Sequence, residues 1–420
     1  MKASSSSKTR RHPRWLRVLL AVLAVVLIVV LVFVVVLSVL LYTGNKTVQT
    51  APANAFYQAP SSFDTTPGSV IREEPITQGV PSNSTAMRIL YTTTAFDTGE
   101  PTVSSASLFV PNTPASGAGR PIIAWAHPTT GITTACAPSL ADDGGASTIP
   151  GLDSFLQQGY AVVATDYPGL GTQGPHPFLV GSSEARAILD GVRATLNTPE
   201  AKAGNRFIVW GHSQGGQAAL WTGQMAKSYS PELDLLGVAA AAPASELVPL
   251  YDADIDTLAA SILGPMVFYS WSEVYPDTSM ESIITPIAMP IALKVAATCI
   301  NSEKDLESIV LDAVLMTKVM VRANPTTVEP WKTLMRQNSA GGSPIGVPIL
   351  ITQGTDDTVV HPEVTQNFVQ KLCSNGETVY FQLIKGVGHD VAGTVSAPAV
   401  ALWAQDRFDG IRAPSNCGAQ

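Results

Sequence analysis

The chain has 420 residues, a formal net charge of −8 at pH 7, and only 14% charged residues. This composition excludes a disordered or collagen-like chain and is ample for a sizeable apolar core. Six basic residues lie in 1–17, so the remainder holds 19 basic against 33 acidic residues, about −14, which argues against a nucleic-acid partner.

A long apolar segment follows the basic N-terminus. Residues 18–41 are almost all Val, Leu, Ala, Ile and Phe, and as a helix they would measure about 36 Å against roughly 30 Å of bilayer hydrocarbon. We predict that 1–17 is a cytoplasmic tail and 18–41 a transmembrane signal anchor, which places the domain that follows outside the cell membrane. The alternative is a signal peptide cleaved near the small residues Ala53-Asn54-Ala55, which would release a secreted protein.

Residues 42–80 are rich in Thr, Pro, Ala, Ser and Gln, and their repeated prolines argue against any regular element. We predict a stalk, or a strap lying on the domain. Strand patterns begin after this segment. Those at 88–94 and 105–110 predict an antiparallel hairpin, because a turn-forming stretch separates them.

Continuous apolar runs then alternate with helical patterns. Runs without polar alternation suit parallel strands buried on both faces. They occur at 121–126, 160–165, 207–210, 235–242, 347–352 and 378–384, with helical patterns near 154–158, 182–196, 363–372 and 391–409. We predict an α/β fold with a mostly parallel, doubly wound sheet, built from core segments 81–250 and 341–420.

Residues 251–340 interrupt this alternation with several helices, the clearest at 303–322. Six of the nine methionines of the chain fall in this part. We predict a helical cap inserted into the core, with pliable methionine side chains either over a lipophilic substrate or in the insertion's own core.

The most informative stretch joins the strand at 207–210 to a helix rich in small residues. It reads Gly211-His212-Ser213-Gln214-Gly215, a G-x-S-x-G motif in the strand-turn-helix context of a nucleophile elbow. A serine hydroxyl is a weak nucleophile at neutral pH, so it needs a base and an orienting acid. In a doubly wound sheet these should lie in loops at the carboxyl ends of strands.

Two late loops supply both groups. Asp357 is the predicted acid, because it stands three residues after the glycine that ends its strand; Asp356 is the alternative. His389 is the predicted general base, because it follows the last strand and lies between glycines and a helix. His176 and His361 lie in proline-rich loops more typical of surface turns.

An acyl-transfer intermediate also needs N–H donors for its oxyanion. Gln214 follows the serine, so its backbone N–H is predicted to be one donor. The second should come from the loop after 121–126. Pro128 has no N–H, so Thr129 is the first candidate and Thr130 the second.

The four cysteines all follow the apolar segment and show no C-x-x-C spacing, which favours two disulfides over a metal site. Four cysteines allow three connectivities. Cys136 follows the oxyanion loop and Cys299 lies in the insertion, so we predict that this pair tethers the cap. Cys373 and Cys417, both late in the chain, would then fasten the C-terminal tail.

Five segments together resemble the secretory lipases, a group of α/β-hydrolases: the elbow Gly-His-Ser-Gln-Gly, Ala-His-Pro-Thr-Thr-Gly-Ile at 126–132, Thr-Asp-Tyr-Pro-Gly-Leu-Gly at 165–171, Gly-Thr-Asp-Asp at 354–357 and Gly-His at 388–389. The similarity covers about residues 60–420. It implies a serine lipase or esterase of lipid catabolism that acts on acylglycerols or other lipophilic esters. Pro128, where related hydrolases often have glycine, departs from the wider pattern.

The predicted mechanism is acyl transfer through Ser213, His389 and Asp357, in the nucleophile, acid, base order of α/β-hydrolases. It requires no metal or organic cofactor. A serine peptidase or an acyltransferase would share these residues, and a non-catalytic surface protein on the same scaffold is the remaining alternative.

Overall fold

The computed structural model describes residues 14–42 and 48–418, which belong to two compact units divided after Lys46. In the first unit, helix α1 (Arg14–Tyr42) contains the predicted apolar segment. Among the residues described with their side chains, no helix is both long and apolar enough to cross a membrane, so the predicted span is not confirmed. Most of the predicted basic tail, 1–13, lies outside the described residues.

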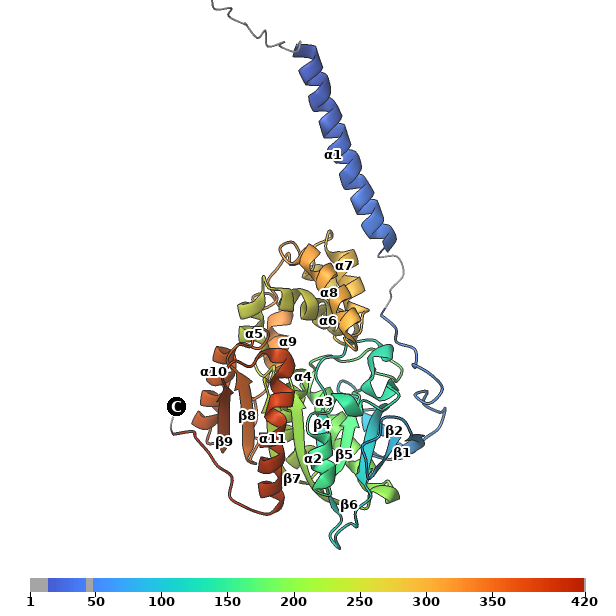
Figure 1. Cartoon of the computed structure of the whole chain (residues 1–420), viewed down its shortest axis with the longest axis vertical. Helices are drawn as coiled ribbons and strands as arrows, with labels where there is room; N and C mark the ends of the chain where they lie inside the picture. The colour runs from blue at the N-terminus through green and yellow to red at the C-terminus, as the bar shows by residue number, and fades with distance from the viewer. Residues whose placement is uncertain (1–13, 43–47, 419–420) are drawn as a thin grey trace, which may run out of the picture. The chain divides into compact units, whose positions relative to one another are not determined.

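The second unit contains a nine-stranded sheet in the order β1-β2-β3-β5-β4-β6-β7-β8-β9 (Figure 1). The six strands from β4 to β9 run parallel, whereas the pairs β1–β2, β2–β3 and β3–β5 are antiparallel. The predicted mostly parallel sheet and its entry hairpin, β2 and β3, are therefore confirmed. The strands are β1 (Val70–Ile76), β2 (Ser84–Thr94), β3 (Pro101–Pro111), β4 (Arg120–Ala126), β5 (Ala161–Thr165), β6 (Ala203–His212), β7 (Asp234–Ala241), β8 (Ile349–Gly354) and β9 (Val379–Ile384).

Strand β1 corrects the expectation that 42–80 holds no regular element. It lies at the edge of the sheet and pairs only with β2. Proline has no N–H to donate, and an edge strand tolerates this because one side of it needs no ladder partner. Pro75 therefore marked an edge strand rather than a break.

The residues before β1 lie against the same unit. The backbone N–H of Ala53 donates to the Gly171 carbonyl, and the Gln49 carbonyl accepts from Thr134. Tyr57 is buried, and its hydroxyl shares a hydrogen bond with Ser139. From residue 48 onward, this segment is therefore held on the domain as a strap.

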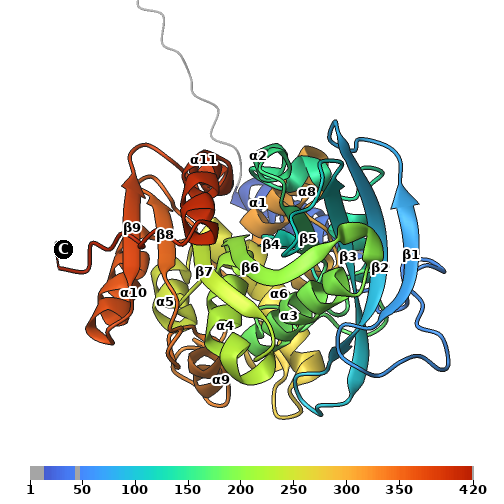
Figure 2. The ribbon, with the colours of Figure 1, turned by 90° about the horizontal axis from the view of Figure 1, so that it is seen from below.

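Helices cover both faces of the sheet (Figure 2). On one face lie α3 (Gly181–Leu196), α4 (Gln214–Tyr229) and α10 (Pro362–Ser374), and on the other α2 (Leu152–Gln157) and α11 (His389–Phe408). The central strands are buried on both sides, which explains their unbroken apolar runs.

An insertion of helices separates β7 from β8 and lies above the sheet in Figure 1. It has its own apolar core, in which five of its six methionines are buried. Methionine therefore serves here mainly as core filling, although Met335 also lines the cavity described below. The helices are α5 (Leu247–Asp254), α6 (Leu258–Val274), α7 (Met289–Ala296), α8 (Glu303–Met316) and α9 (Trp331–Asn338).

Helix α8 is shorter than the predicted 303–322. Beyond its end, the chain pairs with an earlier part of the insertion: the Arg322 N–H donates to the Ile283 carbonyl, and the Thr285 N–H donates to the Met320 carbonyl. These backbone hydrogen bonds between distant segments take the place of the last predicted helical turns. The apolar periodicity of 303–322 cannot indicate such a pairing, because it reflects only neighbouring residues.

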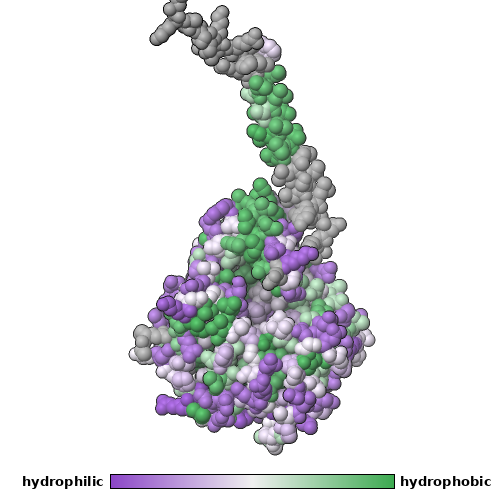
Figure 3. Space-filling model, viewed as in Figure 1, coloured by the Kyte–Doolittle hydropathy of each residue, from purple (hydrophilic) through white to green (hydrophobic). Residues whose placement is uncertain are grey.

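Apolar side chains also gather on the outside of the insertion (Figure 3). Leu311, Val314 and Leu315 form one face of α8 and are 60–70% exposed. The opposite face of the same helix is buried through Ile309, Ala313 and Met316. Helix α8 is thus apolar on both sides, and one of these sides faces solvent.

Both predicted disulfides are confirmed. Cys136 pairs with Cys299 and Cys373 with Cys417, with Cα atoms 5.2 and 5.3 Å apart respectively. The first bridge joins the loop after β4 to the insertion, and the second joins α10 to the C-terminal segment.

Candidate active site

Ser213 lies on the sharp turn between β6 and α4, with φ +59° and ψ −119°. The turn requires glycine on both sides of it. A Cβ at Gly211 would lie 2.0 Å from the Gly215 carbonyl oxygen, and one at Gly215 would lie 1.9 Å from the Ala126 carbonyl oxygen. The G-x-S-x-G motif therefore forms the strained elbow that exposes a nucleophile at the end of a strand.

The structure brings the three predicted catalytic residues together. His389 Nε2 lies 2.8 Å from Ser213 Oγ, and His389 Nδ1 lies 2.8 Å from Asp357 Oδ2. His389 is the first residue of α11, and Asp357 lies in the loop after β8. The arrangement suits proton transfer from the serine to an imidazole that a carboxylate orients.

The surroundings of Asp357 keep it ionised. Burial alone would raise its pKa, but hydrogen bonding and charge from His389, with the N–H groups of Val359 and Val360, lower the pKa below its ordinary value. Gln353 donates a further hydrogen bond to Oδ2. The alternative carboxylate, Asp356, is exposed and accepts from Thr355, so it is Asp357 that meets the histidine.

The other histidines near the site have structural contacts. His212 packs against the His389 ring with centroids 5.0 Å apart, and burial lowers its pKa to about 3, so it remains neutral beside the base. His361 Nε2 lies 3.0 Å from Asp254, where the loop before α10 meets α5. His176 is buried and lies beside the Gln214 side chain.

The predicted oxyanion loop lies beside the nucleophile. Thr129, Ser213 and Gln214 line one cavity. The Thr130 carbonyl accepts a hydrogen bond from the Ile300 N–H, next to the Cys136–Cys299 bridge. The insertion is thus tied to the backbone of this loop, while the role of the Thr129 and Gln214 N–H groups stays a prediction.

The cavity leads from Ser213 between the core and the insertion. It encloses about 690 Å³, including its open mouth, and its walls are mostly apolar. Helices α5 and α6 supply much of this wall, through Leu247, Leu250, Tyr251, Leu263, Val267 and Phe268. Such a shape suits a lipophilic chain held with one end at the serine hydroxyl.

Sequence reasoning missed Glu184, which is fully buried in the first turn of α3 and contacts Gln214. A signal existed. Glu184 stands four residues before Ile188, in the apolar stripe of that helix, and an acidic residue on a buried face needs a reason. Among the described residues, no cluster of three or more His, Cys, Asp or Glu could hold a metal ion.

Known proteins that are similar to this chain in sequence or in structure include lipases and esterases. The chain is 25% identical over 395 residues to lipase A of Arthroderma benhamiae, covering 86% of this chain and 80% of that one. It is also 25% identical to a secreted triacylglycerol lipase of Malassezia globosa, over 87% of this chain and 81% of the relative. A probable inactive lipase of Mycobacterium tuberculosis matches at 23% identity over 84% of this chain and 82% of the relative.

Among solved structures, Candida antarctica lipase A in its closed state superimposes with a TM-score of 0.71 at 21% identity, over 87% of this chain and 88% of that chain. At 21% sequence identity, this structural similarity supports the shared fold alone. The family model described as secretory lipase matches residues 151–416, which is more than half of the chain. The chain therefore belongs to the secretory lipase family of α/β-hydrolases and is an enzyme of the lipase and esterase type.

Proposed function

We propose that the protein hydrolyses lipophilic carboxylic esters, acylglycerols among them, through Ser213, His389 and Asp357. The observation that carries this proposal is the continuous set of hydrogen bonds from Ser213 through His389 to Asp357, at one end of an apolar cavity. The name of the Malassezia relative, a triacylglycerol lipase, supports the substrate class.

The reaction proceeds in two halves. Ser213 Oγ attacks the ester carbonyl while His389 Nε2 accepts its proton, and Asp357 stabilises the imidazolium through Nδ1–H. The N–H groups of Gln214 and Thr129 bind the oxyanion. His389 then donates this proton to the departing alcohol, and the acyl group remains bound to Ser213 Oγ as an acyl-enzyme. In the second half, water attacks the acyl carbonyl while His389 accepts its proton, and His389 returns that proton to Ser213 Oγ as the carboxylic acid departs.

The test compares the wild type with Ser213→Ala and His389→Ala. Both variants should lose ester hydrolysis and fluorophosphonate labelling to a similar extent, because members of such a unit fail together. An ester panel, a peptide panel and added alcohol acceptors distinguish hydrolase from peptidase and acyltransferase. A wild-type protein that neither labels nor hydrolyses any ester would instead favour the non-catalytic alternative, a property that the name of the Mycobacterium relative suggests for that protein.

We further propose that the enzyme is exported, as the family description suggests. The signal anchor at 18–41 stays a prediction, and its alternative is cleavage near Ala53-Asn54-Ala55, where the three residues are exposed. An N-terminal tag should be protected from external protease while activity sediments with membranes. Full activity in the culture fluid, in a protein that begins near Phe56, would establish cleavage instead.

A further inference from the structure

The side chain of Gln214 is held by two buried acceptors. Its Nε2 lies 2.7 Å from Glu184 Oε1 and 3.3 Å from His176 Nε2. His176 Nδ1 lies 2.9 Å from the Pro168 carbonyl, which can only accept, so this nitrogen carries the ring proton and Nε2 is free to accept. Each of the two amide hydrogens of Gln214 therefore has its own acceptor.

The side chain of Glu184 has no exposed surface, and a backbone N–H from the preceding loop holds its carboxyl in place. Its Oε1 also accepts from the Leu179 N–H at 3.1 Å. Its Oε2 is buried and has no hydrogen-bond partner among the described residues. A carboxylate in this place would be a buried, uncompensated charge, whereas a protonated carboxyl can remain there at much lower cost.

The ionisable groups that face this carboxyl are neutral near pH 7. Burial lowers the pKa of His176 to about 3, and burial raises the pKa of Tyr167 well above its ordinary value. Glu184 itself has its pKa raised to about 8 by burial, against smaller lowering effects from the hydrogen bonds of Gln214 and Leu179. Because burial outweighs these hydrogen bonds, the carboxyl is protonated at neutral pH.

Gln214 is the first residue of α4 and directly follows the nucleophile. Its backbone N–H can serve the oxyanion only if the residue is held in one orientation, since such donors act through preorganisation. We propose that Glu184, as a neutral carboxylic acid, is a positioning residue that holds Gln214 and so orients the oxyanion donor beside Ser213. This inference rests on the proposed function.

Ionisation of Glu184 would weaken catalysis. A negative charge in contact with the Gln214 side chain would lie in a buried region, one residue's length from the N–H that is predicted to bind the developing oxyanion, and the two negative charges would repel. Turnover should therefore fall as pH rises through about 8. A histidine that acts as general base gives no such alkaline loss, because it remains deprotonated there.

The experiment measures kcat/KM on a soluble ester and the rate of fluorophosphonate labelling from pH 6 to 9.5. For the wild type, both should fall about tenfold between pH 7 and pH 9, as one group with a pKa near 8 loses its proton. Glu184→Gln keeps an acceptor oxygen and cannot ionise, so its profile should stay flat. Glu184→Ala should lower kcat more than it changes KM, at every pH in the range.

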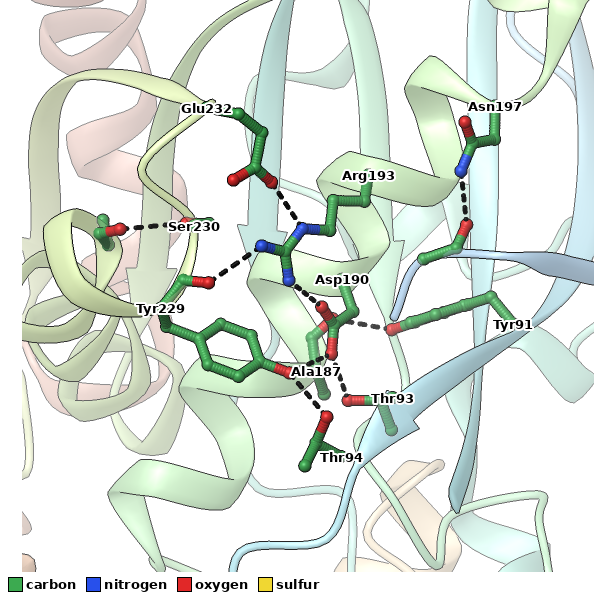
Figure 4. A network of polar contacts seen from close by, with 12 residues as sticks. Tyr91, Thr93, Thr94, Ala187, Asp190, Arg193, Asn197, Tyr229, Ser230 and Glu232 are labelled. Atoms are coloured by element: carbon green, nitrogen blue, oxygen red, sulfur yellow. Dashed lines mark hydrogen bonds and ion pairs between the residues drawn. The ribbon is translucent and has the colours of Figure 1, made fainter. Parts of the chain in front are cut away.

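Asp190→Asn is the matched control. Asp190 is also buried on α3, but it binds Thr93, Tyr229 and Arg193 in a separate network (Figure 4). This variant should lower the melting temperature and leave the alkaline limb of the profile as in the wild type. Loss of the limb in both variants would show that general loosening of α3 is responsible and would overturn the proposal.

Other results are equally decisive. A wild-type profile that is flat to pH 9.5, or a Glu184→Gln profile with the wild-type limb, would overturn the role of Glu184 while leaving the ester hydrolase intact. The wild-type profile needs no variant, so this test holds even if a substituted protein fails to fold. An enzyme whose activity survives Ser213→Ala would overturn the proposed function itself, which is a separate outcome.

Discussion

At Asp357, two adjacent carboxyl groups have opposite environments within one loop. Asp357 is buried and accepts hydrogen bonds from His389 and two backbone N–H groups, whereas Asp356 faces solvent. Only the first can orient an imidazole, because orientation requires a fixed acceptor in direct contact with the ring.

Replacing each aspartate in turn with asparagine should show which of the two carboxyl groups orients His389. Asp357→Asn keeps the size of the side chain but favours the wrong histidine tautomer, so kcat should fall by about 10⁴, as the corresponding change does in serine proteases. Asp356→Asn should remain within a few-fold of the wild type. Steady-state kinetics on one soluble ester measures both, and a collapse confined to the Asp356 variant would show that the acid is misassigned.

Glu184 also makes a prediction about stability. Its pKa in the folded protein, about 8, lies above the ordinary glutamate value, so the unfolded chain loses the proton first as pH rises. The carboxyl therefore contributes stability that is fully present below about pH 4.5 and is lost progressively up to about pH 8. The melting temperature of Glu184→Gln minus that of the wild type should increase across this window. A difference that does not change with pH would contradict the raised pKa.

At the scale of elements, the exposed apolar face of α8 leads to a prediction about whether the enzyme acts on dissolved or on aggregated esters. Poorly soluble esters lie in aggregates with apolar surfaces, and an exposed apolar patch on a soluble domain often marks a contact of this kind. Leu311, Val314 and Leu315 present such a patch on the insertion, whose helices α5 and α6 also line the cavity (Figure 3).

Replacing Leu311, Val314 and Leu315 together with serine should leave hydrolysis of a soluble short-chain ester unchanged, since the side chains are exposed and distinct from the cavity lining. Hydrolysis of an emulsified triacylglycerol should fall several-fold. Leu402→Ser, at a 65% exposed position toward the other end of α11 from His389, is the control and should change neither rate. Equal losses on both substrates would indicate damage to the fold rather than to a lipid contact.

Across the whole molecule, the two disulfides have different consequences. The Cys136–Cys299 bridge links residues 163 positions apart and joins the insertion to the loop beside Ser213. The Cys373–Cys417 bridge links residues 44 positions apart, and neither of its cysteines lines the cavity. In the chain-entropy model, they stabilise by up to about 5 and 4 kcal/mol. Only the first also holds part of the candidate site, because Gly131 packs against Cys136.

Alanine pairs in place of each bridge should separate these roles. Loss of Cys136–Cys299 should lower both the melting temperature and kcat, because the loop that holds Thr129 and Thr130 would lose its covalent link to the insertion and keep the weaker hydrogen bond between Thr130 and Ile300. Loss of Cys373–Cys417 should lower the melting temperature and leave kcat near the wild-type value. Calorimetry and ester kinetics measure the two effects, and unchanged kcat in the first variant would separate the tether from catalysis.

The sequence by itself determined the parallel strands, the elbow at Ser213, and the positions of Asp357 and His389 after late strands. Strands buried on both faces leave unbroken apolar runs, and the turn at Ser213 leaves glycines where any Cβ would collide with backbone. Both are local consequences of geometry, so they can be predicted from neighbouring residues.

Tertiary structure alone decided the features that depend on distant contacts. Strand β1 exists because β2 offers it an edge, and α8 ends early because 320–322 pairs with 283–285. In the same way, the place of Glu184 in the apolar stripe of α3 indicates burial, but only the fold shows that its carboxyl contacts Gln214 and Leu179. Pairing partners arise only when remote segments meet, and no local pattern in the sequence records which segments these will be.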